Sequence, residues 1–188
     1  QWHEGHSSPP PFTPPPPLPT MQYGLGNDQF GGFGHSLFLA LGFPFETTAA
    51  VARLILAGTL DRHPSLKLLV AHSGGCLPFL AGRLNSCVEG EPALAASLEK
   101  RPSEYLKMLY YDAVIYGDAQ MSMVQDLMES EDTIMFGTDH PFFPPPEGGT
   151  AAVRWPSTDK NHHAIAELDP AVAHKVRSAN ARALLRIE

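Results

Sequence analysis

The chain has 188 residues, of which 43% are hydrophobic and 18% charged, a composition that is typical of a folded globular domain and excludes global disorder. Thirteen lysines and arginines against twenty aspartates and glutamates give a net charge of −7, so neither nucleic acid nor an anionic membrane is expected as a partner. No apolar run approaches the roughly eighteen residues of a membrane span. Two cysteines are too few for a disulfide framework, and no secretory signal pattern is visible, so we expect a cytoplasmic protein.

Proline is concentrated at the start of the sequence, where residues 1–20 hold eight of the nineteen prolines. Such a run disfavours both helix and sheet interior, because each proline removes a backbone donor and fixes φ. We therefore predict a disordered leader over residues 1–20 and a folded portion over residues 21–188. Within the folded portion, residues 21–46 are rich in glycine and aromatic residues, which indicates a long loop followed by a short helical stretch.

The first sharp helical pattern begins at Thr47, a residue type that caps helices well. Val51, Leu54 and Ile55 follow at helical spacing, which predicts one apolar face. Gly58 stands where a C′ glycine in the left-handed conformation would end the helix. We therefore expect a capped helix between Thr47 and Gly58.

Downstream, short apolar runs alternate with stretches of helical period. The runs predicted as buried strands are residues 66–71, 110–115 and 133–136, and the predicted helices are residues 77–90, 119–129, about 160–168 and 171–185. The side chains predicted to face inward are Leu77, Leu80, Leu84 and either Cys87 or Val88 in the first of these helices, and Met123, Leu127 and Met128 in the second. Alternation of this kind favours an α/β fold with parallel strands and outer helices. The interpretation is the C-terminal half of a (β/α)8 barrel, that is a partial TIM barrel, with a small doubly wound sheet as the alternative.

Two of the predicted strands are followed directly by residues that can carry chemistry. His72 follows the run at 66–71, and Asp139 comes three residues after the run at 133–136. Because the carboxyl ends of parallel strands share one edge, an imidazole and a carboxylate there would suit a divalent metal such as Zn²⁺. The alternatives are a hydrogen-bonded rim histidine and an aspartate in a turn. Gly74 and Gly75 either allow a close approach to a ligand or simply begin a loop.

Other candidate residues carry weaker signals. Arg83, in the predicted helix after His72, could clamp a substrate carboxylate, or it is a solvated surface group. His140 adjoins Asp139 and need not face the same way. His3 and His6 have neither the spacing nor the helix of a metalloprotease motif, and His162 is expected to face solvent together with its neighbour.

Several motifs in this order resemble the amidohydrolase-related metal-dependent decarboxylases. They are Leu-Gly-Phe-Pro-Phe-Glu-Thr-Thr at 41–48, Leu-Val-Ala-His-Ser-Gly-Gly at 69–75, Leu-Pro-Phe at 77–79 with Gly-Arg at 82–83, Phe-Gly-Thr-Asp-His-Pro-Phe at 136–142 and Asn-Ala-Arg at 180–182. The likeness covers about residues 18–187. The family includes aminocarboxymuconate-semialdehyde, γ-resorcylate, dihydroxybenzoate and isoorotate decarboxylases.

The resemblance implies a TIM barrel with one divalent ion, Zn²⁺ or Mn²⁺, that decarboxylates an aromatic, pyrimidine or muconate-type carboxylic acid without oxidation. Asp139 matches the metal-ligating aspartate of the last strand, and His72 matches the histidine that orients or deprotonates the activated water. Arg83 matches an arginine that binds the substrate carboxylate and can cross from a neighbouring subunit, which implies a homodimer. Phe142 would stack on a planar substrate ring, or it fills the pocket wall.

The sequence also departs from the family pattern. The H-x-H pair that these enzymes carry on their first strand is not found, and Thr13 stands where a ligand histidine is expected. Two other functions therefore stay open beside decarboxylation. One is metal-dependent hydrolysis of a lactone or amide on the same scaffold, and the other is a non-catalytic, truncated copy.

Overall fold

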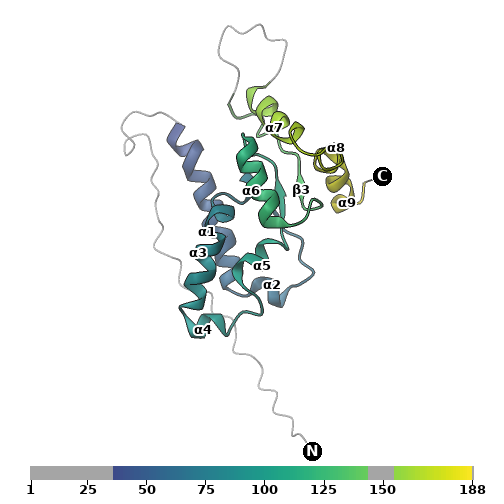
Figure 1. Cartoon of the computed structure of the whole chain (residues 1–188). Coiled ribbons are helices and arrows are strands. Elements are labelled where there is room, and N and C mark those ends of the chain that lie inside the picture. The colour runs from purple at the N-terminus through teal and green to yellow at the C-terminus, as the bar shows by residue number, and fades with distance from the viewer. Residues whose placement is uncertain (1–35, 144–154, 188) are drawn as a thin grey trace, which may run out of the picture. The chain divides into compact units, whose positions relative to one another are not determined.

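The computed structural model describes residues 36–143 and 155–187 (Figure 1). The chain divides into two compact units, residues 1–42 and 43–188. In the first unit, the described residues include one π-helical turn, Phe38–Gly42. The predicted disordered leader at residues 1–20 lies outside the described residues and stays a prediction. All elements below belong to the second unit.

Within the described residues, three parallel strands form a sheet in the order β1 (Leu69–Val70), β2 (Tyr110–Asp112) and β3 (Ile134–Met135). Leu69 lies opposite Tyr110, and Tyr111 lies opposite Ile134. The predicted α/β class with parallel strands is confirmed. Each strand is shorter than the apolar run that predicted it. The length of a strand is set by its hydrogen bonds to the neighbouring strand, and the apolar run continues beyond the last of these bonds.

Helices connect and flank the strands (Figure 1). They are α1 (Phe43–Leu56), α2 (Thr59–Arg62), α3 (Leu77–Glu89), α4 (Pro92–Ala95), α5 (Pro102–Leu106), α6 (Asp118–Met128), α7 (Pro156–Ala166), α8 (Pro170–His174) and α9 (Asn180–Leu185). A π-helical turn, Lys175–Ala179, joins α8 to α9. The predicted helical stretches after the first strand are all present, and α7 begins at a proline four residues before the predicted start.

The core lies between the sheet and the inner faces of these helices. Its fully buried side chains include Ile55, Tyr111, Met121, Ile134, Ile165 and Val176. Two predicted inward residues are wrong: Met123 is 42% exposed and Leu54 is 36% exposed. In α6 the buried face runs through Met121, Val124 and Met128, so Met123 falls on the other side of the helix. In α3 the buried alternative is Val88, since Cys87 is exposed.

The predicted cap at Thr47 is also wrong. α1 begins at Phe43, so Thr47 lies one turn inside the helix. Its hydroxyl lies 3.1 Å from Nδ1 of His72, so it contacts a residue distant in sequence and not the backbone N–H groups at the start of the helix. The other end of the helix matches the prediction: Gly58 has φ 64° and donates its backbone N–H to the carbonyl of Ile55.

One helical stretch, Phe38–Leu56, is long and apolar enough to cross a membrane by length and composition. It carries Glu46 and Arg53, and in α1 the side chains of Val51 and Ile55 are buried in the core. An amphipathic helix that lines a core passes the same test of length and hydropathy. The expectation of no membrane partner therefore stays a prediction.

The loop after β1 packs closely against protein. A Cβ on Gly74 would lie 2.9 Å from the Tyr111 ring, and one on Gly75 would lie 2.3 Å from the carbonyl oxygen of Pro44. Close approach is therefore what these glycines permit, but to the sheet and to α1 rather than to a ligand.

We predict that Gly75→Ala lowers the free energy of unfolding by about 2–4 kcal/mol, because the position combines φ +63° with backbone and Thr48 atoms inside contact distance. The control is Gly82→Ala in α3, where a Cβ would meet nothing within 4 Å. That change should be neutral or stabilising by up to about 1 kcal/mol. Equal denaturation midpoints in urea for the two variants would contradict this account of the loop.

Candidate active site

The segments that leave the three strands share an unusual backbone conformation. His72 and Ser73 follow β1 with φ 55° and 50°, Tyr116 follows β2 with φ 64°, and Asp139 follows β3 with φ 57°. A residue with a side chain held in this left-handed region costs about 1–3 kcal/mol, and such residues cluster at active sites and ligand clamps. Each of the three strands is thus followed by a strained residue at the carboxyl edge of the sheet.

Asp112, the last residue of β2, ties the end of β1 to β2. Its Oδ1 accepts hydrogen bonds from the backbone N–H groups of Ser73 at 3.0 Å and Val114 at 3.2 Å. Its main-chain oxygen accepts a third bond, from the Ser73 hydroxyl at 2.7 Å. Burial raises the pKa of Asp112, while these N–H donors and the nearby His72 act in the opposite direction. The bonds stabilise the left-handed turn that carries His72.

The His72 imidazole is held from the side of α1. Its Nδ1 lies 3.1 Å from Oγ1 of Thr47, and its ring stacks near the Phe43 ring with centroids 6.2 Å apart and planes 23° apart. These contacts occupy one ring nitrogen and one ring face. Nε2 is the nitrogen left for chemistry.

Asp139 is held by a phenol. The Tyr116 hydroxyl donates to Oδ2 of Asp139, and burial, together with this bond and the charges of Asp139 and Asp112, raises the pKa of Tyr116. The backbone N–H groups of Ile115 and Tyr116 both donate to Oδ1 of Asn161, a fully buried residue of α7. The outer helix therefore fixes the turn from which the phenol reaches the carboxylate.

Partly exposed aromatic rings border these polar groups. The ring centroids of Phe142 and Phe43 lie 6.5 Å apart, and those of Phe143 and Tyr116 lie 5.7 Å apart. Phe142 is tied to the site through its N–H, which donates to the carbonyl of Asp139. Its own carbonyl accepts from the Trp155 indole at 2.5 Å. An apolar rim beside these polar groups suits a planar ligand.

The structure brings three of the four predicted site residues to one edge. Asp112 contacts the turn of His72 and acts electrostatically on Tyr116, which holds Asp139, and Phe142 follows Asp139. The fourth, Arg83, lies in α3 with an exposed side chain. The chemical roles of all four stay predictions.

The neighbouring histidines lie outside this arrangement. His140 turns toward Trp155, with ring centroids 4.6 Å apart. His162 and His163 are exposed, as predicted, although the His162 ring meets the edge of Phe136. His3 and His6 lie outside the described residues.

Three residues of the site were missed in the sequence. Asp112 is the charged residue in an otherwise apolar strand run, which is a signal for a buried, hydrogen-bonded carboxylate. Tyr116 directly follows the same run, so the strand-end rule that selected His72 and Asp139 applies to it as well. Thr47 gave no usable signal, because a threonine at a helix start and one inside the first turns look alike in sequence.

The described residues offer few donors for a divalent cation. Among residues 36–143 and 155–187, no group of three or more His, Cys, Asp or Glu side chains could hold a metal ion. Asp139 keeps one carboxylate oxygen beyond the one bonded to Tyr116, and His72 keeps Nε2. Both are donors that divalent zinc or manganese accepts. The donor chemistry fits such an ion, and the described residues supply part of its coordination sphere.

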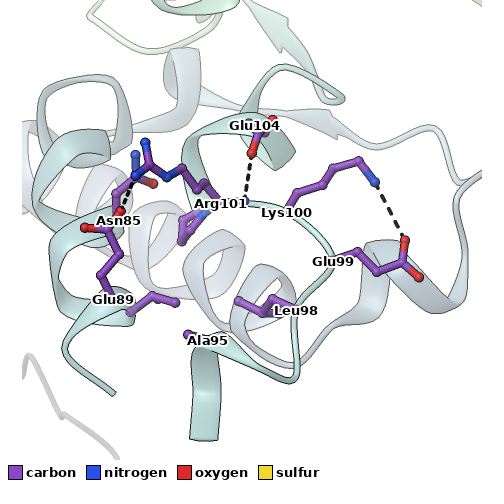
Figure 2. Close-up of a pocket in the computed structure, with 10 residues that line it drawn as sticks. Asn85, Glu89, Ala95, Leu98, Glu99, Lys100, Arg101 and Glu104 are labelled. Carbon is purple, nitrogen blue, oxygen red and sulfur yellow. Dashed lines mark hydrogen bonds and ion pairs between the residues drawn. The ribbon is translucent and has the colours of Figure 1, made fainter. Parts of the chain in front are cut away.

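A pocket of about 340 Å³ is formed by other residues. Its lining comes from α3 and from the segment that leads into β2, and includes Asn85, Leu98 and Lys100 (Figure 2). The charged groups of its walls have partners: the Arg101 guanidinium pairs with Glu89 at 2.7 Å, and the Glu104 carboxylate accepts the backbone N–H of Arg101 at 2.9 Å. The lining segment leads into the start of β2, whereas parallel α/β proteins hold their chemistry at the carboxyl ends of their strands.

We predict that Asp112→Asn changes the pH dependence of stability. Because burial raises the pKa of Asp112 in the folded state, the folded protein binds this proton more tightly than the unfolded chain does, and the contribution of Asp112 to stability falls as pH rises above about 3.8. The amide variant keeps an acceptor but lacks this titration. Its stability relative to wild type should thus increase with pH through this window and then level off.

The measurement is urea denaturation across pH, with the exposed Asp126→Asn on α6 as control for the change in net charge. A stability difference between Asp112→Asn and wild type that is constant at every pH would contradict the burial of a charge at this position.

Comparison with known proteins gives one family and several relatives. The amidohydrolase family profile matches residues 8–187. The crystal structure of an IDCase from Metarhizium anisopliae is 42% identical, with a TM-score of 0.75 over 82% of this chain and 43% of that one. The 2-amino-3-carboxymuconate-6-semialdehyde decarboxylase of Dictyostelium discoideum is 33% identical over 103 residues, 54% of this chain and 28% of the relative.

A more distant structure, 5-carboxyvanillate decarboxylase from Novosphingobium aromaticivorans with bound manganese, shares the fold at 23% identity and a TM-score of 0.62, over 78% of this chain and 40% of that one. The chain thus spans less than half the length of these relatives.

Proposed function

Because the chain belongs to the amidohydrolase family, we propose that it carries the His72–Asp139 side of the active site of a metal-dependent, non-oxidative carboxy-lyase. The proposed substrate is a planar aromatic, pyrimidine or muconate-type carboxylic acid. The observation that carries the proposal is that His72 and Asp139 follow two strands at the same edge of the sheet, where Asp112 holds the turn of His72, Tyr116 holds Asp139 and aromatic rings border both. The names of the relatives, an isoorotate and a carboxymuconate-semialdehyde decarboxylase, support this class of reaction.

The reaction sets clear demands on the site. The bond between the ring carbon and the carboxylate carbon breaks, its electron pair stays on the ring carbon, and one proton takes the place of the CO₂ that leaves. A divalent ion, when bound, fixes the carboxylate and stabilises the negative charge. We propose Zn²⁺ or Mn²⁺, held in part by the carboxylate oxygen of Asp139 that is not bonded to Tyr116.

The chain's own residues would then divide the remaining work. Nε2 of His72 takes up a proton from the solvent and passes it to Asp139, and Asp139 delivers that proton to the ring carbon, so the one proton consumed comes from the solvent. Phe142 and Phe43 orient the planar ring and exclude bulk water. Arg83 binds a substrate carboxylate, either in its own subunit or across a homodimer, and the whole assembly acts in the cytoplasm.

One specific observation favours a second candidate, a non-catalytic chain. Fewer than three ligand side chains converge in the described part of the chain. The discriminating assay follows CO₂ release from isoorotate and from hydroxybenzoates in the presence of Mn²⁺ or Zn²⁺, beside ring opening of lactones. CO₂ release supports the carboxy-lyase, and lactone opening without CO₂ release supports a hydrolase. The absence of both reactions supports the non-catalytic chain.

We predict that Asp139→Asn lowers turnover of the carboxylic acid by at least about a hundredfold, because the variant loses both a negatively charged donor and a proton carrier. Steady-state CO₂ release at saturating Mn²⁺ measures the effect. The control is Asp132→Asn, an exposed carboxylate that pairs with Lys175. Full turnover in Asp139→Asn would exclude both roles of Asp139.

A second prediction concerns retention of the ion. With two candidate donors among the described residues, the 188-residue chain should lose zinc on dialysis and keep well under one equivalent, measured by elemental analysis. A dialysed sample that holds one equivalent of zinc per chain would show that further ligands are present.

A further inference from the structure

We propose that Thr47 is a positioning residue that fixes the tautomer of His72. In this arrangement Oγ1 of Thr47 accepts a hydrogen bond from the N–H at Nδ1 of His72, so that Nε2 presents its lone pair to the site. The inference rests on the proposed role of His72 as a base.

The contact joins two rigid elements. Thr47 lies inside α1, and its Oγ1 is 3.1 Å from Nδ1 of a residue 25 positions away in sequence. The left-handed turn that carries His72 is held to β2 by the bonds between Ser73 and Asp112. Because both partners are fixed by other contacts, the imidazole meets the hydroxyl in one orientation.

The neighbouring residue shows that Thr47 is not needed to attach the turn to the helix. The Thr48 hydroxyl donates to the carbonyl of Pro44 at 2.7 Å and accepts the backbone N–H of Cys76 at 2.8 Å. The bond from Cys76 already ties α1 to the chain after β1, and the bond to Pro44, within α1, fixes the direction of the Thr48 hydroxyl. Thr48 therefore carries the structural contact, and the hydroxyl of Thr47 is left to act on the imidazole.

The role of His72 as a base determines which group donates in the bond between Thr47 and His72. A neutral imidazole has one N–H, and a base needs its lone pair on the reacting nitrogen, so a lone pair on Nε2 requires hydrogen on Nδ1. After Nε2 accepts a proton, Nδ1 still carries its hydrogen. A bond in which Thr47 accepts survives this cycle, whereas one in which Thr47 donates would have to break. The nearby carboxylate of Asp112 interacts favourably with the imidazolium.

The test reads the imidazole nitrogens directly. In the chain labelled with ¹⁵N-histidine, long-range proton–nitrogen NMR at a pH above the histidine titration separates the two tautomers, and the spectrum of His72→Gln assigns the signals. We expect wild type to show His72 with hydrogen on Nδ1. Thr47→Val, which keeps the shape and removes the hydroxyl, should shift the tautomer ratio about tenfold toward hydrogen on Nε2, equivalent to about 1.4 kcal/mol.

Two further variants separate positioning from stability. Thr47→Ser restores a hydroxyl and should restore the wild-type ratio. Thr48→Val makes the same chemical change one residue later; it should lower the midpoint of thermal unfolding and leave the His72 tautomer as in wild type. A wild-type His72 with hydrogen on Nε2, or a ratio that Thr47→Val leaves unchanged or that Thr48→Val shifts equally, would overturn the inference. The wild-type spectrum decides the direction even where a variant fails to fold.

The outcome is separable from that of the proposed function. The tautomer is measured without substrate or metal. The expected spectra without CO₂ release would support the role of Thr47 and exclude the carboxy-lyase. CO₂ release together with a wild-type tautomer ratio in Thr47→Val would support the carboxy-lyase and exclude the role of Thr47.

Discussion

The hydrogen bonds around Asp112 are the constraint on which the rest of the site depends. A carboxylate at the end of an apolar strand is costly to bury even in part, and backbone N–H groups that point at it offset this cost. Those of Ser73 and Val114 do so, and they come from two different turns. One side chain thus fixes how the chain leaves both β1 and β2.

That constraint explains why non-glycine residues at the carboxyl edge hold left-handed conformations. The strain at His72, Ser73 and Tyr116 persists because each turn is held by more bonds than its own sequence supplies. Asp112 holds the first turn from within the sheet, and Asn161 holds the second from α7. The result is a set of side chains whose directions are fixed before any ligand arrives.

The sequence was sufficient for those features that depend on periodicity. Apolar runs and helical spacing predicted the alternating strands and helices, and the strand-end rule placed His72 and Asp139 at one edge. What it missed depends on tertiary packing. Thr47 carries the same local signal as a helix cap, and only the position of the imidazole distinguishes the two. Met123 was predicted buried because apolar residues lie on more than one side of α6. Successive residues are about 100° apart around a helix, and only the packing against neighbouring elements shows which side faces the core. Tyr116 becomes part of the site only because Asn161, 45 residues later, holds its backbone.

The central claim is that His72 and Asp139 face a common cation. The most direct measurement adds Mn²⁺ to the isotope-labelled chain and records which NMR signals the paramagnetic ion broadens, a readout that works even for weak binding. The account predicts early, selective broadening at His72, Asp139 and Phe142, abolished by Asp139→Asn. Broadening confined to the exposed carboxylates Glu131 and Asp132, or unchanged by that substitution, would contradict it.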